Sequence, residues 1–206
     1  AILLILGLVT VSGCTALTAL GRSSAPLDVH ELRAPSDLPE ALRARPVDFV
    51  IEVPETGGAI DTDRILVRTA PTQVSYLPEA RWTEDAPLML QTAMVESFLR
   101  TGAFRYVGRR PLGASGDVAL VTELVDFGAE TTGAEKGATV RMTLVARLVR
   151  EEDASVLATR MFSRAISLPG TTTPVLLDGF GSVSDAVLSD LARWALGAQG
   201  IAIAGS

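Results

Sequence analysis

The residue with the most specific chemical potential in this sequence is Cys14, the only cysteine among 206 residues. A single thiol has no partner for an intramolecular disulfide and no second thiolate with which to hold zinc. The one histidine, His30, follows a stretch rich in Ser, Ala and Pro, so neither a Cys–His nor a Ser–His–Asp catalytic site is expected. The chemistry left to Cys14 is modification of its own sulfur.

The segment before Cys14, AILLILGLVTVSG, is uncharged and apolar. It matches the signal-peptide apolar region of about 7–15 residues and is shorter than the roughly 20 residues of a spanning helix. Val11, Ser12 and Gly13 then precede the cysteine, and this order resembles the bacterial lipobox, in which small residues let a peptidase groove close over the extended chain. We therefore expect residues 1–13 to be a signal peptide whose initiator and basic leader precede Ala1.

The lipobox resemblance implies that Cys14 becomes the mature N-terminus and carries diacylglycerol on its sulfur and a third acyl chain on its amine. Each buried CH₂ adds about 0.8 kcal/mol of membrane affinity, so three chains form a firm anchor. The alternative is a short N-terminal helix with an inert buried thiol. Thr15 stands where lipoproteins retained in the inner membrane often carry Asp, which favours the outer membrane over the inner one.

Composition excludes several other functions. The net charge of −6 disfavours nucleic-acid binding, and the pairs Arg43 with Arg45 and Arg109 with Arg110 are expected on solvated turns. Asp61 and Asp63 lack the Gly and Glu positions of a calcium loop, so no metal is expected. Apart from the covalent lipid on Cys14, no cofactor is indicated, and the chain is not expected to be an enzyme.

The remaining sequence divides into three parts. Residues 14–46 are rich in Pro, Ser and Ala and are interpreted as the lipidated cysteine and a tether, with one short edge strand in LDVHELRA, residues 27–34. Residues 47–198 carry the regular hydrophobic patterns of a folded domain. The tail, residues 199–206, has small and apolar residues whose order indicates no particular secondary structure.

Within the domain the hydrophobic period changes twice, from alternation to helical spacing and back. The 86–101 region places Leu90, Met94 and Phe98 on one stripe, and the last helix, from about residue 178, does the same with Val183, Val187 and Leu191. The expected fold is α+β, with a mostly antiparallel sheet and both amphipathic helices on one face. The strands are expected at 47–53, 64–70, 73–77, 104–108, 117–130, 138–151 and 155–167.

A family resemblance rests on residues 60–107, which contain an Asp, a strand with an Arg, a segment with Tyr, and a Trp before acidic residues and a helix. This order is similar to the ABC-type transport auxiliary lipoprotein family, which includes paraquat-inducible lipoprotein C. ELRAP at 31–35 and LARWAL at 191–196 match its early strand and closing helix, although His30-Glu31 stands where an aromatic is common. The family-signature residues, also candidates for an interface, are Asp63, Arg68, Tyr76 and Trp82.

The resemblance implies a function in transport between two membranes. Family members accompany ABC permease and ATPase complexes with MCE (mammalian cell entry) domain proteins, which move phospholipid or other hydrophobic cargo. The chain is thus expected to be a periplasmic, outer-membrane-anchored accessory subunit. A second copy of the chain, in a homo-oligomer, is a further candidate partner. A stand-alone lipid-binding carrier and an assembly factor for an envelope machine are the alternatives. Trp82 is expected at a strand–helix junction, partly buried.

Overall fold

Strand β7 (Val118–Thr131) is the axis of a nine-stranded mixed sheet in the computed structural model, which describes residues 27–70, 72–131 and 137–204. On one side, β7 pairs with β8 (Ala138–Arg150), and β8 pairs with β9 (Ser155–Leu168), both antiparallel. All three strands lie within one residue of the ranges that the alternation of apolar and polar residues predicts. Because few residues separate these long alternating strands in the sequence, antiparallel pairing is the simplest arrangement.

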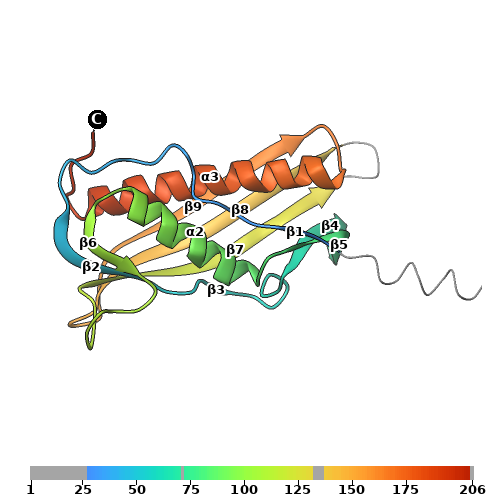
Figure 1. Cartoon of the computed structure of the whole chain (residues 1–206). Coiled ribbons are helices and arrows are strands. Elements are labelled where there is room, and N and C mark those ends of the chain that lie inside the picture. The colour runs from blue at the N-terminus through green and yellow to red at the C-terminus, as the bar shows by residue number, and fades with distance from the viewer. Residues whose placement is uncertain (1–26, 71, 132–136, 205–206) are drawn as a thin grey trace, which may run out of the picture.

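The other side of β7 is shared by three shorter strands that run parallel to it. They are β2 (Arg45–Ile51), β3 (Glu55–Thr56) and β4 (Arg64–Ala70). The antiparallel β5 (Gln73–Trp82) extends the sheet beyond β4, and the parallel edge strand β1 (Asp28–His30) follows it. At the opposite end, β6 (Phe104–Gly108) pairs with β2 in parallel (Figure 1).

Two helices, α2 (Ala86–Arg100) and α3 (Thr173–Ala198), cover one face of the sheet, as predicted (Figure 1). Strand β8 shows why the two faces differ, because its inward side chains are fully buried and its outward ones are partly exposed. The inward side chains are Val140, Met142, Leu144, Ala146 and Leu148. Neither described helix is long and apolar enough to cross a membrane.

Two elements are longer than predicted. Strand β5 continues through Pro78 to Trp82. Pro78 lies where the pairing register of β4 and β5 shifts, so its missing N–H interrupts no regular ladder of hydrogen bonds. Helix α3 begins at Thr173, before the predicted start, with a proline in its first turn. Gly179 and Gly181 therefore lie inside the helix rather than before it.

Residues 31–44, called the strap below, run from β1 to β2 across the helical layer (Figure 1). Leu32 and Leu38 pack against the core, and the amide of Ala41 donates to the Thr101 carbonyl at 2.9 Å. The tail also packs against the strap, because Ile203 forms an isolated antiparallel β-bridge with Ala41. The strap and the described tail are thus part of the folded domain, whereas Cys14 and the lipobox residues Val11, Ser12 and Gly13 lie outside the described residues.

Candidate functional site

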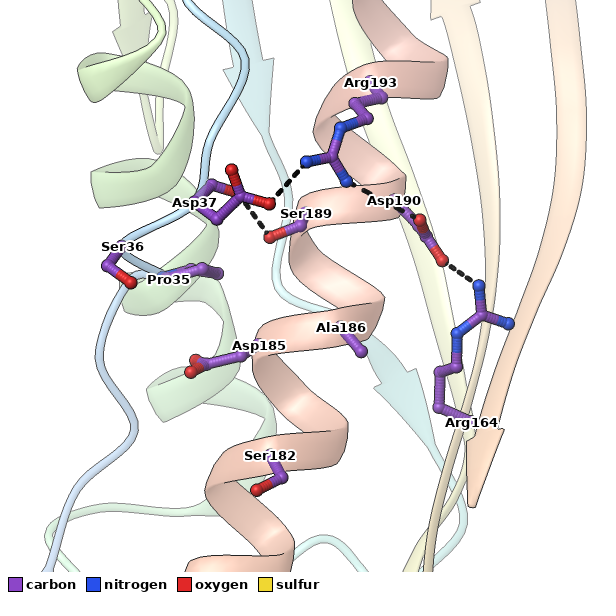
Figure 2. A pocket seen from close by; sticks show the side chains of 10 residues that line it. All are labelled: Pro35, Ser36, Asp37, Arg164, Ser182, Asp185, Ala186, Ser189, Asp190 and Arg193. Atoms are coloured by element: carbon purple, nitrogen blue, oxygen red, sulfur yellow. Dashed lines mark hydrogen bonds and ion pairs between the residues drawn. The ribbon is translucent and has the colours of Figure 1, made fainter. Parts of the chain in front are cut away.

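A hollow of about 440 Å³ lies between the strap and α3, and it is called the charged hollow below (Figure 2). The strap contributes one wall, α3 contributes the opposite wall, and β9 contributes a single arginine. The α3 residues recur every three or four positions, which places them on the polar stripe of an amphipathic helix. The lining residues are Pro35, Ser36, Asp37, Arg164, Ser182, Asp185, Ala186, Ser189, Asp190 and Arg193.

A chain of ion pairs holds the three parts of the charged hollow together. Arg193 Nη2 lies 2.7 Å from Asp37 Oδ2, which ties the strap to α3. Its Nη1 lies 3.9 Å from Asp190 Oδ1, and Asp190 in turn binds Arg164 of β9 (Figure 2). Each of these charges therefore has a partner of opposite sign.

The hydroxyls of the two α3 serines in the hollow are already bound to backbone carbonyls. Ser189 Oγ donates to the Asp37 carbonyl and Ser182 Oγ donates to the Asp178 carbonyl, each at 2.8 Å. The lining residues include no histidine to serve as a general base for a serine nucleophile. This arrangement suits recognition of a polar group rather than covalent catalysis.

Asp185 differs from the other carboxylates, because no described cation forms an ion pair with it. Its side chain points towards the strap (Figure 2). Burial raises its pKa above the ordinary value of 3.8, since desolvation disfavours the charged form. The ionised hollow holds three carboxylates against two guanidinium groups, so it can accept a cationic or hydrogen-bond-donating group.

The sequence-predicted residues lie elsewhere, on β4, β5 and the turn before β4. Asp63 forms an ion pair with Arg81 at 3.1 Å, and its carbonyl accepts the amide of Trp82 at 2.8 Å. Arg68 Nη1 lies 3.0 Å from Asp126 Oδ1. The hydroxyl of Tyr76 donates to the Ala59 carbonyl at 3.2 Å. All of these contacts are internal to the domain.

Trp82 lies at the end of β5, close to the start of α2, as predicted, but it is buried more completely than expected. Only 2% of its surface is exposed. Its ring stacks on Phe127 at 5.7 Å and meets Phe180 of α3 edge-on at 5.5 Å. The expectation of partial burial was wrong because α3, which is distant in sequence, covers this indole.

A comparison with protein families finds that the family model described as the ABC-type transport auxiliary lipoprotein component matches residues 31–192. The chain belongs to this family. The match spans the strap, strands β2 to β9, helix α2 and most of α3. This chain is therefore an auxiliary lipoprotein of a transport-associated family, in agreement with the resemblance seen in its sequence.

Solved structures share the fold of this auxiliary lipoprotein. A crystal structure of a Xanthomonas campestris protein is 22% identical, covers 85% of this chain and 97% of its own, and has a TM-score of 0.73. A second crystal structure, of an uncharacterised protein, is 13% identical, covers 83% and 99% of the two chains, and has a TM-score of 0.64. At these identities the likeness establishes the fold alone. The comparison with curated proteins finds no match.

Sequence reasoning missed the charged hollow of this auxiliary lipoprotein. Its walls come from the strap, β9 and α3, and no local pattern brings Asp37 near Arg193, 156 residues away. The only available signal was the polar spacing of Asp185, Ser189 and Arg193 on the predicted last helix. Among the described residues, no group of acidic, His or Cys side chains is arranged to hold a metal ion.

Proposed function

We propose that this auxiliary lipoprotein is the accessory subunit of an ABC transporter with an MCE-domain protein. It is held in the outer membrane by lipids on Cys14, faces the periplasm, and helps to move phospholipid or other hydrophobic cargo across the envelope. The observation that carries the proposal is the family match over residues 31–192, which follows a lipobox-like Val11–Cys14 in the same chain.

The architecture of the domain supports a docking function. Arg193 and Ser189 of α3 both bind Asp37 of the strap. These contacts hold the strap and α3 together as one preformed surface. Preorganised surfaces bind partners with less loss of conformational entropy. The charged hollow lies in this surface, and a transporter subunit that places a cationic side chain beside Asp185 would complete its charge balance.

Co-purification tests the transporter assignment. An affinity-tagged chain is expressed from its own operon, extracted in a mild uncharged detergent, and analysed by mass spectrometry. We expect an MCE-domain protein and an ABC permease or ATPase to elute with it. An Asp185→Lys variant is expected to weaken this association, whereas Glu96→Lys on the exposed face of α2 serves as the matched charge change. Elution without any transporter subunit would contradict the proposal.

The anchor is tested separately by intact mass and membrane fractionation. We expect the native chain to carry acyl groups on a mature N-terminus at Cys14 and to sediment with outer-membrane fractions. Cys14→Ser is expected to abolish palmitate labelling, and Thr15→Asp is expected to move the protein towards inner-membrane fractions. An unmodified thiol in the native protein would remove the anchor from the proposal.

A further inference from the structure

A second hollow, of about 340 Å³, lies where β2 begins and α3 has ended. It is called the arginine hollow below, because its lining includes two arginines and no acidic side chain. Figure 1 places the start of β2 and the C-terminal tail at one end of the domain, and β1 with the β4–β5 hairpin at the other. The lining residues are Leu42, Arg43, Ala44, Arg45, Pro46, Gly200, Ile201 and Ala202.

The backbone around the arginine hollow is fixed by hydrogen bonds between the end of the strap and the tail. The amide of Leu42 donates to the Ala202 carbonyl at 3.0 Å, and the amide of Ala204 donates to the Glu40 carbonyl at 2.9 Å. Gly200 turns the chain with a positive φ of 64° after α3. Ile201, only 7% exposed, anchors the tail in the core. The backbone that forms the hollow is thus held in place by the folded domain.

The two arginines of this hollow lack carboxylate partners among the described residues. Arg45 donates through Nη1 to the Gln199 carbonyl, which holds its guanidinium in place without neutralising it. Arg43 has no described polar partner. A guanidinium has five N–H donors in a fork that matches phosphate and carboxylate oxygens, so most of these donors are free for an anion.

Hydrocarbon lies directly beside these cations. Leu42, next to Arg43 in the chain, is 70% exposed, and Pro46 and Ile201 complete an apolar part of the wall. A free anion would gain nothing from an exposed leucine, whereas an anionic amphiphile would contact both the arginines and the apolar wall. The hollow therefore fits a phosphate attached to hydrocarbon better than a small ion.

We propose that the arginine hollow binds the phosphate group of an anionic phospholipid, with Arg43 and Arg45 on the phosphate oxygens and Leu42 against the adjoining hydrocarbon. The proposal deepens the proposed function, and rests on it only for the source of the lipid. The first described strand, β1, lies at the opposite end of the domain from the arginine hollow (Figure 1). In the proposed function, the transport partner is the source of the lipid.

The test uses the full lipidated chain in dodecyl maltoside micelles at constant ionic strength. Dihexanoyl phosphatidylglycerol, dihexanoyl phosphatidylcholine and inorganic phosphate are titrated separately, and binding is followed by ³¹P NMR. We expect phosphatidylglycerol to bind more tightly than the other two probes. Arg43→Gln with Arg45→Gln is expected to weaken its binding by about tenfold or more, because charge-assisted hydrogen bonds are lost. Partitioning of a lipid into the micelles is the same for every variant, so it cancels when the binding of that lipid is compared between variants.

Two single variants separate the parts of the site. Leu42→Ser is expected to weaken phosphatidylglycerol binding and leave phosphate binding unchanged. Arg43→Gln alone tests the cation without removing any described contact, so its fold should be retained. The matched control is Arg33→Gln, whose side chain is 81% exposed and pairs only with Glu31. Thermal midpoints of all variants check that each is folded.

Three results would overturn the lipid assignment. The first is unchanged phosphatidylglycerol binding in the folded double variant. The second is inorganic phosphate binding as tightly as the lipid, which would make this a simple anion site. The third is displacement of the lipid by a glutamate-rich peptide of higher affinity, which would point to an acidic protein. None of these results depends on co-purification with a transporter, so the proposed function is tested independently.

Discussion

Arg68 of β4 reaches Asp126 of β7, and its Nη1 lies 3.0 Å from Asp126 Oδ1. The two side chains are only 25% and 20% exposed. Asp126 Oδ1 accepts no hydrogen bond from the described residues, so its contact with Arg68 is chiefly electrostatic. Gly128 makes room for it, because a Cβ there would lie 2.8 Å from Arg68 Nη1. Only Val67 and Arg68 of β4 pair with β7, so this part of the sheet has a short ladder. The ion pair gives the two strands a further contact.

Loss of this ion pair should destabilise the domain. Arg68→Ala leaves a largely buried carboxylate without its nearest cation, and we expect the free energy of unfolding to fall by about 1–3 kcal/mol. Arg33→Ala removes an exposed pair instead, and a change within about 0.5 kcal/mol is expected. Urea denaturation measures both. Equal losses in the two variants would show that the Arg68–Asp126 contact contributes no more than a surface pair.

Trp82 is expected to be the more important of the two tryptophans for stability. Trp82→Ala removes an indole that is 2% exposed and packs on Phe127 and Phe180, so a loss of about 3–5 kcal/mol is expected. Trp194 is only partly buried and meets Phe162 edge-on at 5.6 Å. Trp194→Ala should therefore cost clearly less in the same denaturation experiment. An unchanged melting temperature for Trp82→Ala would leave an interface role as the reason for this residue.

Gly179 and Gly181, two of the three glycines of α3, should respond differently to substitution by alanine. At Gly181 a Cβ meets nothing within 4 Å, so Gly181→Ala is expected to stabilise the domain by up to about 1 kcal/mol through helix propensity. At Gly179 a Cβ would lie 2.6 Å from Leu168 Cδ1 and 3.0 Å from Val140 Cγ2. Gly179→Ala must displace these side chains, which offsets the propensity gain. Thermal unfolding of both variants measures the difference, and equal gains would show that α3 does not need a glycine to approach the sheet.

The sequence was most informative where structure depends on local periodicity. The alternation of Val140, Arg141 and Met142 predicts an extended strand with one buried face, and β8 has that arrangement. The apolar stripe through Leu90, Met94 and Phe98 likewise predicts α2 to within a residue at its C-terminal end. These patterns are properties of neighbouring residues, so they can be recognised before the fold is known.

Contacts between distant segments were not predictable in the same way. The parallel pairing of β2 and β4 with β7 has no local signature, because it depends on how the intervening chain crosses the sheet. The predicted strand ended before Pro78, so the second half of β5 was not recognised. The strap was interpreted as a tether because it is rich in proline and small residues. The Nε2 atom of His30 is buried, which the Ser-, Ala- and Pro-rich sequence before this residue did not indicate. Both hollows depend on such long-range contacts.

The charged hollow should make the stability of the domain depend on pH through Asp185. Burial raises the pKa of Asp185 above the ordinary value of 3.8, so the folded state binds its proton more tightly than the unfolded state. Stability therefore falls as the pH rises from the ordinary pKa through the raised one, and it stays lower at neutral pH.

Asp185→Asn cannot ionise and should escape this loss. We expect the variant to gain stability over the unmodified chain at about pH 7, and the gain should shrink towards about pH 4, where the carboxyl is increasingly protonated in both states. The effect is small because solvent reaches the side chain. Urea midpoints across this range measure it, with Glu96→Gln on α2 as an exposed control. A variant that is less stable at neutral pH would show that the ionised Asp185 is favourably held, and the hollow would then have no uncompensated carboxylate to offer a partner.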